Sequence, residues 1–247
     1  MSFLRSLLFT TPLIVLATIV MGTISLIAST FDRSGRLPHR IARIWGRMLL
    51  LAGFVRVRAV GLEKIDRNGS YVFVANHTSY MDIPAILWLI DVQFRFFAKK
   101  GLFRIPFLGT HLKRAGHLPV DRHSARASLK SMTKGAEIIA QQGISMLLFP
   151  EGGRTAVGEG LREFREGAAY IAIKAGVPVV PVAIVGLREL LPMGSFHLRA
   201  GEAVLHIGDP IPTQGMLPRD RAELTQRLYE ELARITGEGR YTVAQAP

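Results

Sequence analysis

The chain has no cysteine among its 247 residues, and that absence excludes several kinds of chemistry. Without thiols it forms no disulfide, no thiolate metal site and no cysteine acyl-enzyme. No histidine cluster with metal-ligand spacing takes their place, so we expect no metal and no bound cofactor. Low-complexity tracts and internal repeats are also missing. The length therefore predicts one well-cored domain with an appendage.

Charge is missing from the N-terminal region, where no charged residue occurs between Ser6 and Phe31. Residues 7–28 therefore predict one apolar helix long enough to reach across a bilayer core. A signal peptide would have a shorter apolar region, of about 7–15 residues, followed by a small-residue cleavage site. Residues 27–30 match such a site poorly, so we expect the helix to be retained. Hydropathy leaves open whether it spans the bilayer or lies in one leaflet.

Positive charge follows the apolar segment directly. Residues 36–53 predict a second helix, on which Arg40, Arg43 and Arg47 recur at helical spacing beside apolar residues. An ordinary helix with solvated arginines is the alternative, but the position after an apolar anchor favours lipid headgroups. We predict that residues 1–53 form a membrane-binding helix pair and that residues 54–247 form an α/β domain. The same charge predicts the cytoplasmic side for that domain.

The net charge of +12 is compatible with two kinds of anionic partner. Nucleic acid is one of them, but a basic block beside a long apolar segment favours a membrane surface, and we expect no nucleic acid. A second basic block covers residues 91–134, with ten Lys or Arg against two acidic residues. That block is a candidate footprint for an anionic substrate.

From residue 54 onward, short apolar segments alternate with helical patterns. Strands are predicted at residues 55–59, 71–75, 94–98, 117–120, 146–149, 179–185 and 203–207. Helices are predicted at residues 84–90, 125–142, 167–175 and 219–235. This alternation predicts an α/β fold with a mixed, largely parallel sheet flanked by helices.

The first motif that can carry chemistry is Asn76-His77-Thr78-Ser79-Tyr80-Met81-Asp82, directly after a predicted strand. Positions five apart do not share a helix face, so His77 must precede the next helix and Asp82 must begin it. Pro84 agrees, because proline fits the first helical turn. Asp82 could then orient the imidazole and leave its other nitrogen free to take a proton. The alternative is an N-capping aspartate beside an unrelated loop histidine.

Ser79 is a weaker candidate for a nucleophile activated by His77. Residues two apart point away from each other in a helix, and no Gly-x-Ser-x-Gly turn surrounds Ser79. Direct attack by a substrate hydroxyl is the better interpretation.

A glycine loop, Phe149-Pro150-Glu151-Gly152-Gly153-Arg154-Thr155, follows the apolar strand predicted at residues 146–149. Paired glycines let backbone N–H groups converge on an anion, and Arg154 could add a bidentate phosphate contact. A glycine turn with a solvated arginine is the alternative.

Two further blocks accompany these motifs. Lys99-Lys100-Gly101 and Gly116-His117-Leu118-Pro119-Val120-Asp121-Arg122 lie within the second basic block, and Arg122 ends a short strand. The apolar strand at residues 177–182, bracketed by prolines, fits either a buried strand or the lining of an acyl groove.

Taken together, the order and spacing of these motifs resemble the glycerolipid acyltransferase family, particularly its bacterial 1-acyl-glycerol-3-phosphate acyltransferases, over roughly residues 55–210. The resemblance implies a catalytic pair made of His77 and Asp82, and an acyltransferase domain at residues 54–247. It implies substrate binding by Arg122 and the Glu151-Gly152-Gly153-Arg154 loop, to which we add Lys100. The family usually has Thr or Ser where this chain has Gly153.

The expected reaction follows from that resemblance. Lysophosphatidic acid would be acylated at its sn-2 hydroxyl by acyl-CoA or acyl-carrier protein, giving phosphatidic acid at the cytoplasmic side of the cell inner membrane. Another lyso-lipid acceptor, such as lyso-ornithine lipid, is the nearest rival, and a glycerol-3-phosphate acyltransferase is a further relative. A non-catalytic basic membrane adaptor would explain the charge and the anchor but not the ordered motifs.

Overall fold

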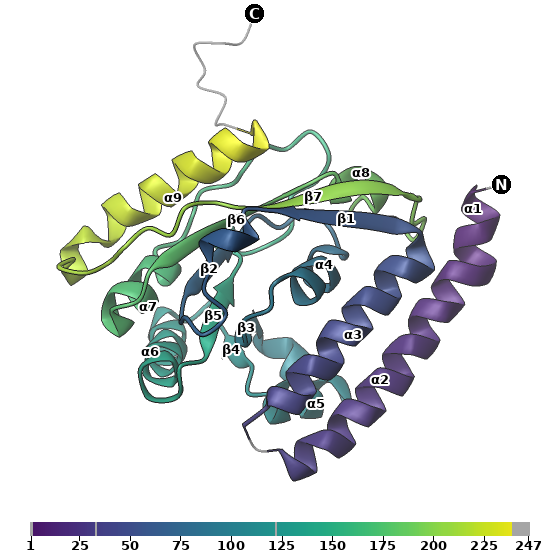
Figure 1. Ribbon diagram of the computed structural model, residues 1–247, viewed down its shortest axis with the longest axis horizontal. Coiled ribbons are helices and arrows are strands. Elements are labelled where there is room, and N and C mark those ends of the chain that lie inside the picture. Colours follow the sequence, from purple (N-terminus) through teal and green to yellow (C-terminus); the bar gives the residue numbers. More distant parts are fainter. Residues whose placement is uncertain (1, 33, 122, 239–247) are drawn as a thin grey trace, which may run out of the picture.

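One seven-stranded sheet forms the middle layer of the protein, as the computed structural model shows for residues 2–32, 34–121 and 123–238 (Figure 1). The strands are β1 (Val55–Val60), β2 (Val72–Ala75), β3 (Phe94–Lys99), β4 (Leu118–Val120), β5 (Ser145–Leu148), β6 (Val179–Val185) and β7 (Gly201–Ile207). Their order is β1-β7-β6-β2-β5-β3-β4. Neighbouring strands run parallel except β6 and β7. The predicted fold class is therefore confirmed.

Helices cover both faces of the sheet (Figure 1). On one face lie α6 (Ala125–Gln142), α7 (Gly167–Ala175) and α9 (Arg221–Thr236), and on the other lie α3 (Arg36–Gly53) and α4 (Asp82–Leu89). Shorter helices are α1 (Ser2–Arg5), α5 (Leu108–Arg114), α8 (Leu187–Leu190) and the 3-10 turns η2 (Leu62–Lys64), η3 (Lys100–Arg104) and η4 (Pro218–Asp220).

The sheet divides two apolar cores, and strand β2 shows why. Successive side chains of a strand point to opposite faces. Phe73 and Ala75 accordingly join the core under α3 and α4, while Val72 and Val74 join the core under α6, α7 and α9. All four residues are fully buried, as expected for a central strand that is apolar throughout.

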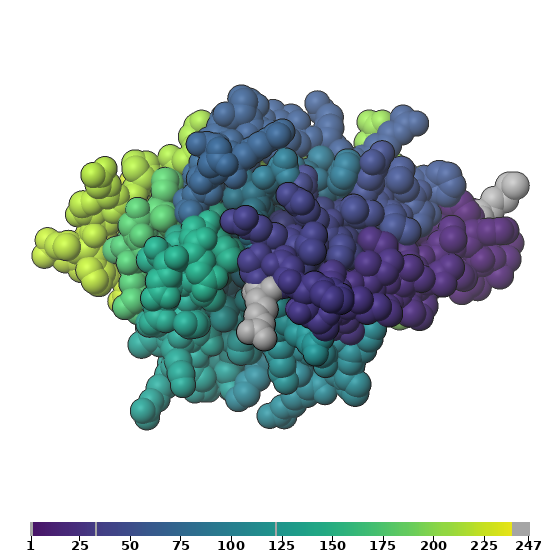
Figure 2. Space-filling view, turned by 60° about the horizontal axis from the view of Figure 1, so that its bottom comes forward, coloured from purple at the N-terminus to yellow at the C-terminus, as the bar shows by residue number. Residues whose placement is uncertain are grey.

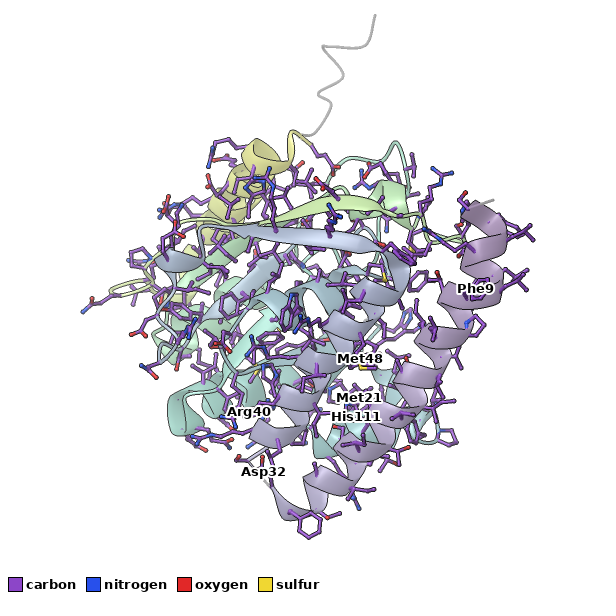
Figure 3. All side chains as sticks on the ribbon, turned by 45° about the vertical axis from the view of Figure 1, so that its right-hand side comes forward. Phe9, Met21, Asp32, Arg40, Met48 and His111 are labelled. Carbon is purple, nitrogen blue, oxygen red and sulfur yellow. The ribbon has the colours of Figure 1, made fainter. Side chains whose placement is uncertain are left out.

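The N-terminal helices form a hairpin along one flank of the domain (Figure 2). A continuous helix runs from α1 through a π-helical segment (Ser6–Thr10) into α2 (Thr11–Phe31), and α3 returns beside it. By length and composition Ser2–Phe31 can cross a membrane, which supports membrane association. Figure 3 shows the exposed Phe9 turned away from the domain and the buried Met21 turned toward it.

The hairpin is also part of the fold. Leu49 and Leu50 of α3 belong to the same buried cluster as Phe73 of the central strand. Gly46 of α3 lies against the backbone of Pro84, and a Cβ there would come within 2.5 Å of the Pro84 carbonyl oxygen. Glycine therefore permits the close approach of α3 to α4. The predicted boundary between residues 53 and 54 falls at the end of α3.

Most predicted elements occur within one or two residues of their expected bounds, but the segment of η3 and α5 was not predicted. Its sequence, Lys100 to Arg114, interleaves cations with apolar residues and contains Pro106 and Gly109, so no clear period is visible. Phe107 has a positive φ of 65° just before α5, which is uncommon for a residue other than glycine. Helix α5 then packs against α2.

Candidate active site

Sheet order brings the two main motifs together. Strands β2 and β5 are parallel neighbours, with Val72 opposite Met146 and Val74 opposite Leu148. Their carboxyl ends therefore meet at the same edge, where α/β sheets bind ligands. The loop after β2 carries His77, and the loop after β5 carries the paired glycines.

His77 and Asp82 form a buried hydrogen-bonded pair. Helix α4 begins at Asp82, and His77 lies before it, so the loop turns the imidazole back onto the carboxylate. The His77 Nδ1 atom lies 2.8 Å from Asp82 Oδ2. The backbone N–H groups of Thr78 and Ser79 donate to the same oxygen at 2.7 and 2.9 Å. Asp82 is fully buried, and these donors hold its carboxylate in one orientation.

Phe149 fixes the ring of His77 further. Phe149 stacks on the imidazole with ring centroids 3.9 Å apart and planes 17° apart. Ser79 takes no part in this contact, because its hydroxyl is buried and donates to the Leu191 carbonyl at 3.1 Å. This placement supports attack by a substrate hydroxyl over a Ser79 nucleophile.

The glycine loop braces the backbone of the histidine loop. Glu151 Oε1 accepts the backbone N–H of His77 at 2.8 Å, and Oε2 accepts that of Arg162 at 3.2 Å. The Thr155 backbone N–H donates to the His77 carbonyl at 2.9 Å. Burial raises the pKa of Glu151 to about 7, although its two backbone donors act in the opposite direction. Glu151 therefore lies behind His77 as a brace, outside the cavity lining.

Arg188 also supports the glycine loop, through Thr155. Arg188, which is buried, donates to the Thr155 hydroxyl at 3.0 Å and pairs with Glu238 at 2.7 and 3.0 Å. Through Thr155 this ion pair reaches the His77 backbone. Sequence reasoning missed Arg188, and no local pattern marks it, because its partners lie 33 and 50 positions away.

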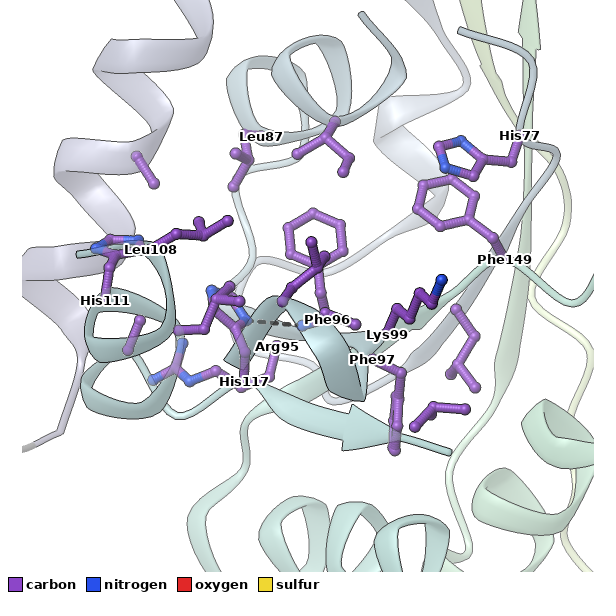
Figure 4. Close-up of a pocket in the computed structure, with 18 of the residues that line it drawn as sticks. His77, Leu87, Arg95, Phe96, Phe97, Lys99, Leu108, His111, His117 and Phe149 are labelled. Atoms are coloured by element: carbon purple, nitrogen blue, oxygen red, sulfur yellow. Dashed lines mark hydrogen bonds between the residues drawn. The ribbon is translucent and has the colours of Figure 1, made fainter. Parts of the chain in front are cut away.

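A cavity of about 750 Å³ opens beside His77 and runs toward the hairpin (Figure 4). Its walls come from α2, α3, α4, β3, α5 and the glycine loop, and they are mainly apolar. His77, Phe149, Gly152, Gly153 and Arg154 line the end that we call the catalytic end. Such a space suits a hydrocarbon chain whose reacting group lies at His77.

Arg154 and Gly152 shape the mouth of this end. The Arg154 Nε donates to the Ser79 carbonyl at 3.2 Å, and its guanidinium lies 4.2 Å from the centre of the Tyr80 ring. Gly152 has φ 73°, a left-handed conformation that favours glycine, and a Cβ there would meet Arg165. The loop therefore places the Arg154 cation beside two glycines in the cavity wall.

The basic residues considered from the sequence as substrate contacts have different positions. Lys100 forms an exposed ion pair with Asp121 at 3.0 Å, while its neighbour Lys99 lines the cavity. Arg122 lies outside the described residues. The structure thus brings His77, Asp82, Glu151, Gly152, Gly153 and Arg154 into one site, and it places Lys99 nearer to that site than Lys100.

Fold and site together place a buried histidine–aspartate pair at one end of an apolar cavity. The sequence profile of the acyltransferase family matches residues 56–185. This match covers more than half of the chain and includes the histidine motif and the glycine loop. The chain belongs to the acyltransferase family.

Two individual members of this family show which proteins the chain is similar to. A chloroplastic 1-acyl-sn-glycerol-3-phosphate acyltransferase of Brassica napus is 34% identical over 72% of this chain and 50% of its own length. A 1-acyl-sn-glycerol-3-phosphate acyltransferase of Chlamydomonas reinhardtii is 32% identical over 85% of this chain and 61% of its own. The chain thus spans half to three fifths of the length of these relatives.

Among solved structures, the 1-acyl-sn-glycerophosphate (LPA) acyltransferase PlsC of Thermotoga maritima is similar over nearly the whole chain. It superposes with a TM-score of 0.81 at 27% identity, covering 98% of this chain and 100% of that one. The similarity includes the N-terminal helices as well as the α/β domain.

Proposed function

We propose that this protein transfers an acyl group from an acyl thioester to the sn-2 hydroxyl of lysophosphatidic acid, giving phosphatidic acid. The observation that carries the proposal is the buried His77–Asp82 pair at one end of an apolar cavity. The names of the relatives agree with this acceptor.

The hydrogen bonds of Asp82 support a role for each imidazole nitrogen in the proposed reaction. Asp82 Oδ2 accepts hydrogen bonds from two backbone N–H groups. We therefore take this oxygen as an acceptor toward His77 too, so that His77 donates its Nδ1–H to it. The Nε2 atom then carries the lone pair and takes the proton from the attacking hydroxyl. As the hydroxyl oxygen bonds to the thioester carbonyl carbon, the proton moves to Nε2, and Asp82 stabilises the imidazolium. The carbon–sulfur bond then breaks, and the protonated Nε2 returns its proton to the thiolate.

The acceptor's phosphate is expected at the mouth of the catalytic end. Arg154 is held there by the Ser79 carbonyl and the Tyr80 ring, and a guanidinium binds phosphate with paired hydrogen bonds. Lys99 adds a second cation on the cavity wall. We keep Arg122 as a predicted contact on sequence grounds. The donor, acyl-CoA or acyl-carrier protein, is a co-substrate, and the reaction as written needs no other cofactor.

The hairpin supports a route from the membrane by which a lipid acceptor would reach the site. Helix α2 buries one face on α3 and α5 and exposes Leu16, Ile19, Ile24 and Ile27 on the other. Because α2 packs beside the domain and lines the cavity, an arrangement within one leaflet exposes its apolar face to lipid without detaching it from the domain. We place the protein on the inner membrane with its domain on the cytoplasmic side, as the arginines of α3 favour.

A panel of lyso-lipid acceptors tests the proposal. The full-length protein in vesicles is supplied with acyl-CoA or acyl-carrier protein and with lysophosphatidic acid, glycerol 3-phosphate or a phosphate-free lyso-lipid. We expect the highest kcat/KM with lysophosphatidic acid. Preference for a phosphate-free acceptor would reject phosphate recognition, and no transfer to any acceptor would support the membrane adaptor instead.

A further inference from the structure

Opposite the catalytic end, the cavity has a second group of polar side chains. His39 of α3, Arg95 of β3, His111 of α5 and His117 all line it, and we call this group the polar end. Figure 4 shows Arg95, His111 and His117 gathered on the side of Phe96 that lies away from His77 and Phe149. The proposed mechanism uses none of these four residues.

The charge at this end belongs to Arg95, which is only 3% exposed. Its Nη2 donates to the Ser34 carbonyl at 2.8 Å and its Nη1 to the Phe94 carbonyl at 3.1 Å. The guanidinium therefore holds the turn between α2 and α3 on the sheet. No described carboxylate forms an ion pair with it, and its charge together with burial disfavours protonation of nearby imidazoles.

The hydrogen bond of His117 fixes which of its nitrogens carries the proton. Its Nδ1 accepts the Phe96 backbone N–H at 3.0 Å, so the neutral ring carries its proton on Nε2. Burial, followed by the charge of Arg95, holds the pKa of His117 well below its usual range. Within the described part of the chain no acceptor meets this Nε2–H, and the ring lines the cavity.

His39 presents the complementary atom. Burial is the main cause that lowers the pKa of His39 to about 3, and a hydrogen bond to the Val92 backbone holds the ring. The Nε2 atom is buried and has no partner among the described residues. Because the neutral ring donates to Val92, this nitrogen is an acceptor. The rings of His39 and His117 pack on Phe94 and Phe96, which are themselves 5.2 Å apart.

A buried acceptor without a partner costs free energy, and the Nε2 atom of His39 is one, while His117 offers its N–H as part of the cavity wall, so this end of the cavity calls for an occupant. A hydroxyl fits, because it accepts from the His117 N–H and donates to the His39 nitrogen. A carboxylate has only acceptors and would face the lone pair of His39. An alkyl chain would satisfy neither nitrogen.

We infer that the polar end binds a hydroxyl group carried by an acyl chain. This inference deepens the proposed function and rests on it, since the chain's carbonyl or ester group would lie at His77. Phe96 pairs with Leu147, two residues before Phe149, which places His117 about 7 Å along the strand from the catalytic level. The hydroxyl therefore belongs to the middle or far part of the chain, because one beside the carbonyl would remain at His77.

A set of acyl thioesters of one chain length tests the inference with the full-length protein and lysophosphatidic acid. The hydroxyl moves stepwise along the chain, and an unsubstituted chain and an ω-carboxyl chain complete the set. We expect kcat/KM to peak at one hydroxyl position, about tenfold above the unsubstituted chain. The same set built into the acceptor's own acyl chain shows which of the two chains enters the polar end.

Two variants remove one partner each while keeping the backbone contacts. In His117→Asn the amide oxygen replaces Nδ1 as acceptor for Phe96, and nothing replaces the Nε2–H. His39→Asn likewise keeps a donor toward Val92 and loses Nε2. Each variant should bring the ratio of hydroxylated to unsubstituted kcat/KM close to one. His206→Asn, on β7 and outside the cavity lining, should keep the wild-type ratio.

Each outcome distinguishes the inferred hydroxyl site from an alternative. A flat profile in wild type for both donor and acceptor chains, with transfer intact, rejects the inference and leaves the proposed function standing. Preference for the ω-carboxyl chain rejects it in favour of an anion at Arg95. If no acceptor is acylated, the proposed function fails, and the polar end is then tested by binding of hydroxylated against unsubstituted long-chain fatty acids. Equal binding of the two would reject the inference as well.

Discussion

The two ends of one cavity hold histidines in opposite situations. At the catalytic end, the Asp82 carboxylate holds His77 and would stabilise the proton that the ring takes in the proposed mechanism. At the polar end, burial and then the charge of the buried Arg95 guanidinium lower the pKa of His39 and of His117. A histidine beside a carboxylate suits proton transfer, whereas one beside a buried cation suits hydrogen bonding as a neutral ring. Burial and the sign of the neighbouring charge therefore distinguish the two sets of imidazoles.

Removing the base should have the largest effect. We expect His77→Ala to lower kcat by about 10³-fold or more, because general-base catalysis by a positioned side chain is lost. Turnover by the full-length variant in vesicles measures this, with folding checked by its thermal unfolding. Near wild-type turnover of a folded His77→Ala protein would contradict the mechanism, and His206→Ala serves as the control.

Removing only the carboxylate charge tests what distinguishes the catalytic end. Asp82→Asn should lower kcat by about 10²-fold or more, because the amide no longer fixes the tautomer or stabilises the imidazolium. The pH profile of kcat/KM should change as well, since the basicity of His77 depends on this partner. Asp209→Asn, which removes an exposed carboxylate paired with Lys64, should change neither quantity.

A smaller effect is expected at the mouth of the catalytic end. Arg154→Lys keeps the charge but loses the planar donor pair, so the KM for lysophosphatidic acid should rise about tenfold. The KM for the acyl thioester should change much less. Arg162→Lys is a matched control, because Arg162 carries the same charge but pairs with Glu159 at the surface. Equal acceptor KM values for wild type and Arg154→Lys would exclude Arg154 from phosphate binding.

The brace behind His77 should give the smallest effect, and it depends on pH. The pKa of Glu151 is raised from 4.5 to about 7, so the folded protein holds a proton that the unfolded chain has released. Between these values stability falls as pH rises, by up to about 1.4 kcal/mol per pH unit for this group. Glu151→Gln removes this contribution. Its free energy of unfolding should therefore improve relative to wild type from pH 4.5 to 7.

Unfolding of both proteins across that pH range provides the measurement. Glu163→Gln, at an exposed position, should follow the wild-type curve. A difference between Glu151→Gln and wild type that stays constant with pH would show that Glu151 titrates in the same way in the folded and unfolded states.

Much of the fold was predictable because its signals are local. Strand β2 is apolar throughout and β1 alternates, which distinguishes a central strand from an exposed edge strand. Helix α6 could be bounded from sequence because Ser124 caps its start and Gly143 ends it in a left-handed conformation. The segment of η3 and α5 has no such signal, and its position depends on packing against α2.

By itself the sequence determined that His77 precedes the helix and that Asp82 begins it, because positions five apart do not share a helix face, and the structure shows that the two side chains meet. It also determined that the glycine loop follows a buried strand. Only the tertiary structure decided that Glu151 supports the His77 backbone, that Lys99 lines the cavity, and that Arg95 lies with His39 and His117. These groupings join residues from separate helices and strands. Spacing along the chain predicts local structure such as a helix or a strand. Burial and shared electrostatic surroundings arise only when those elements pack together.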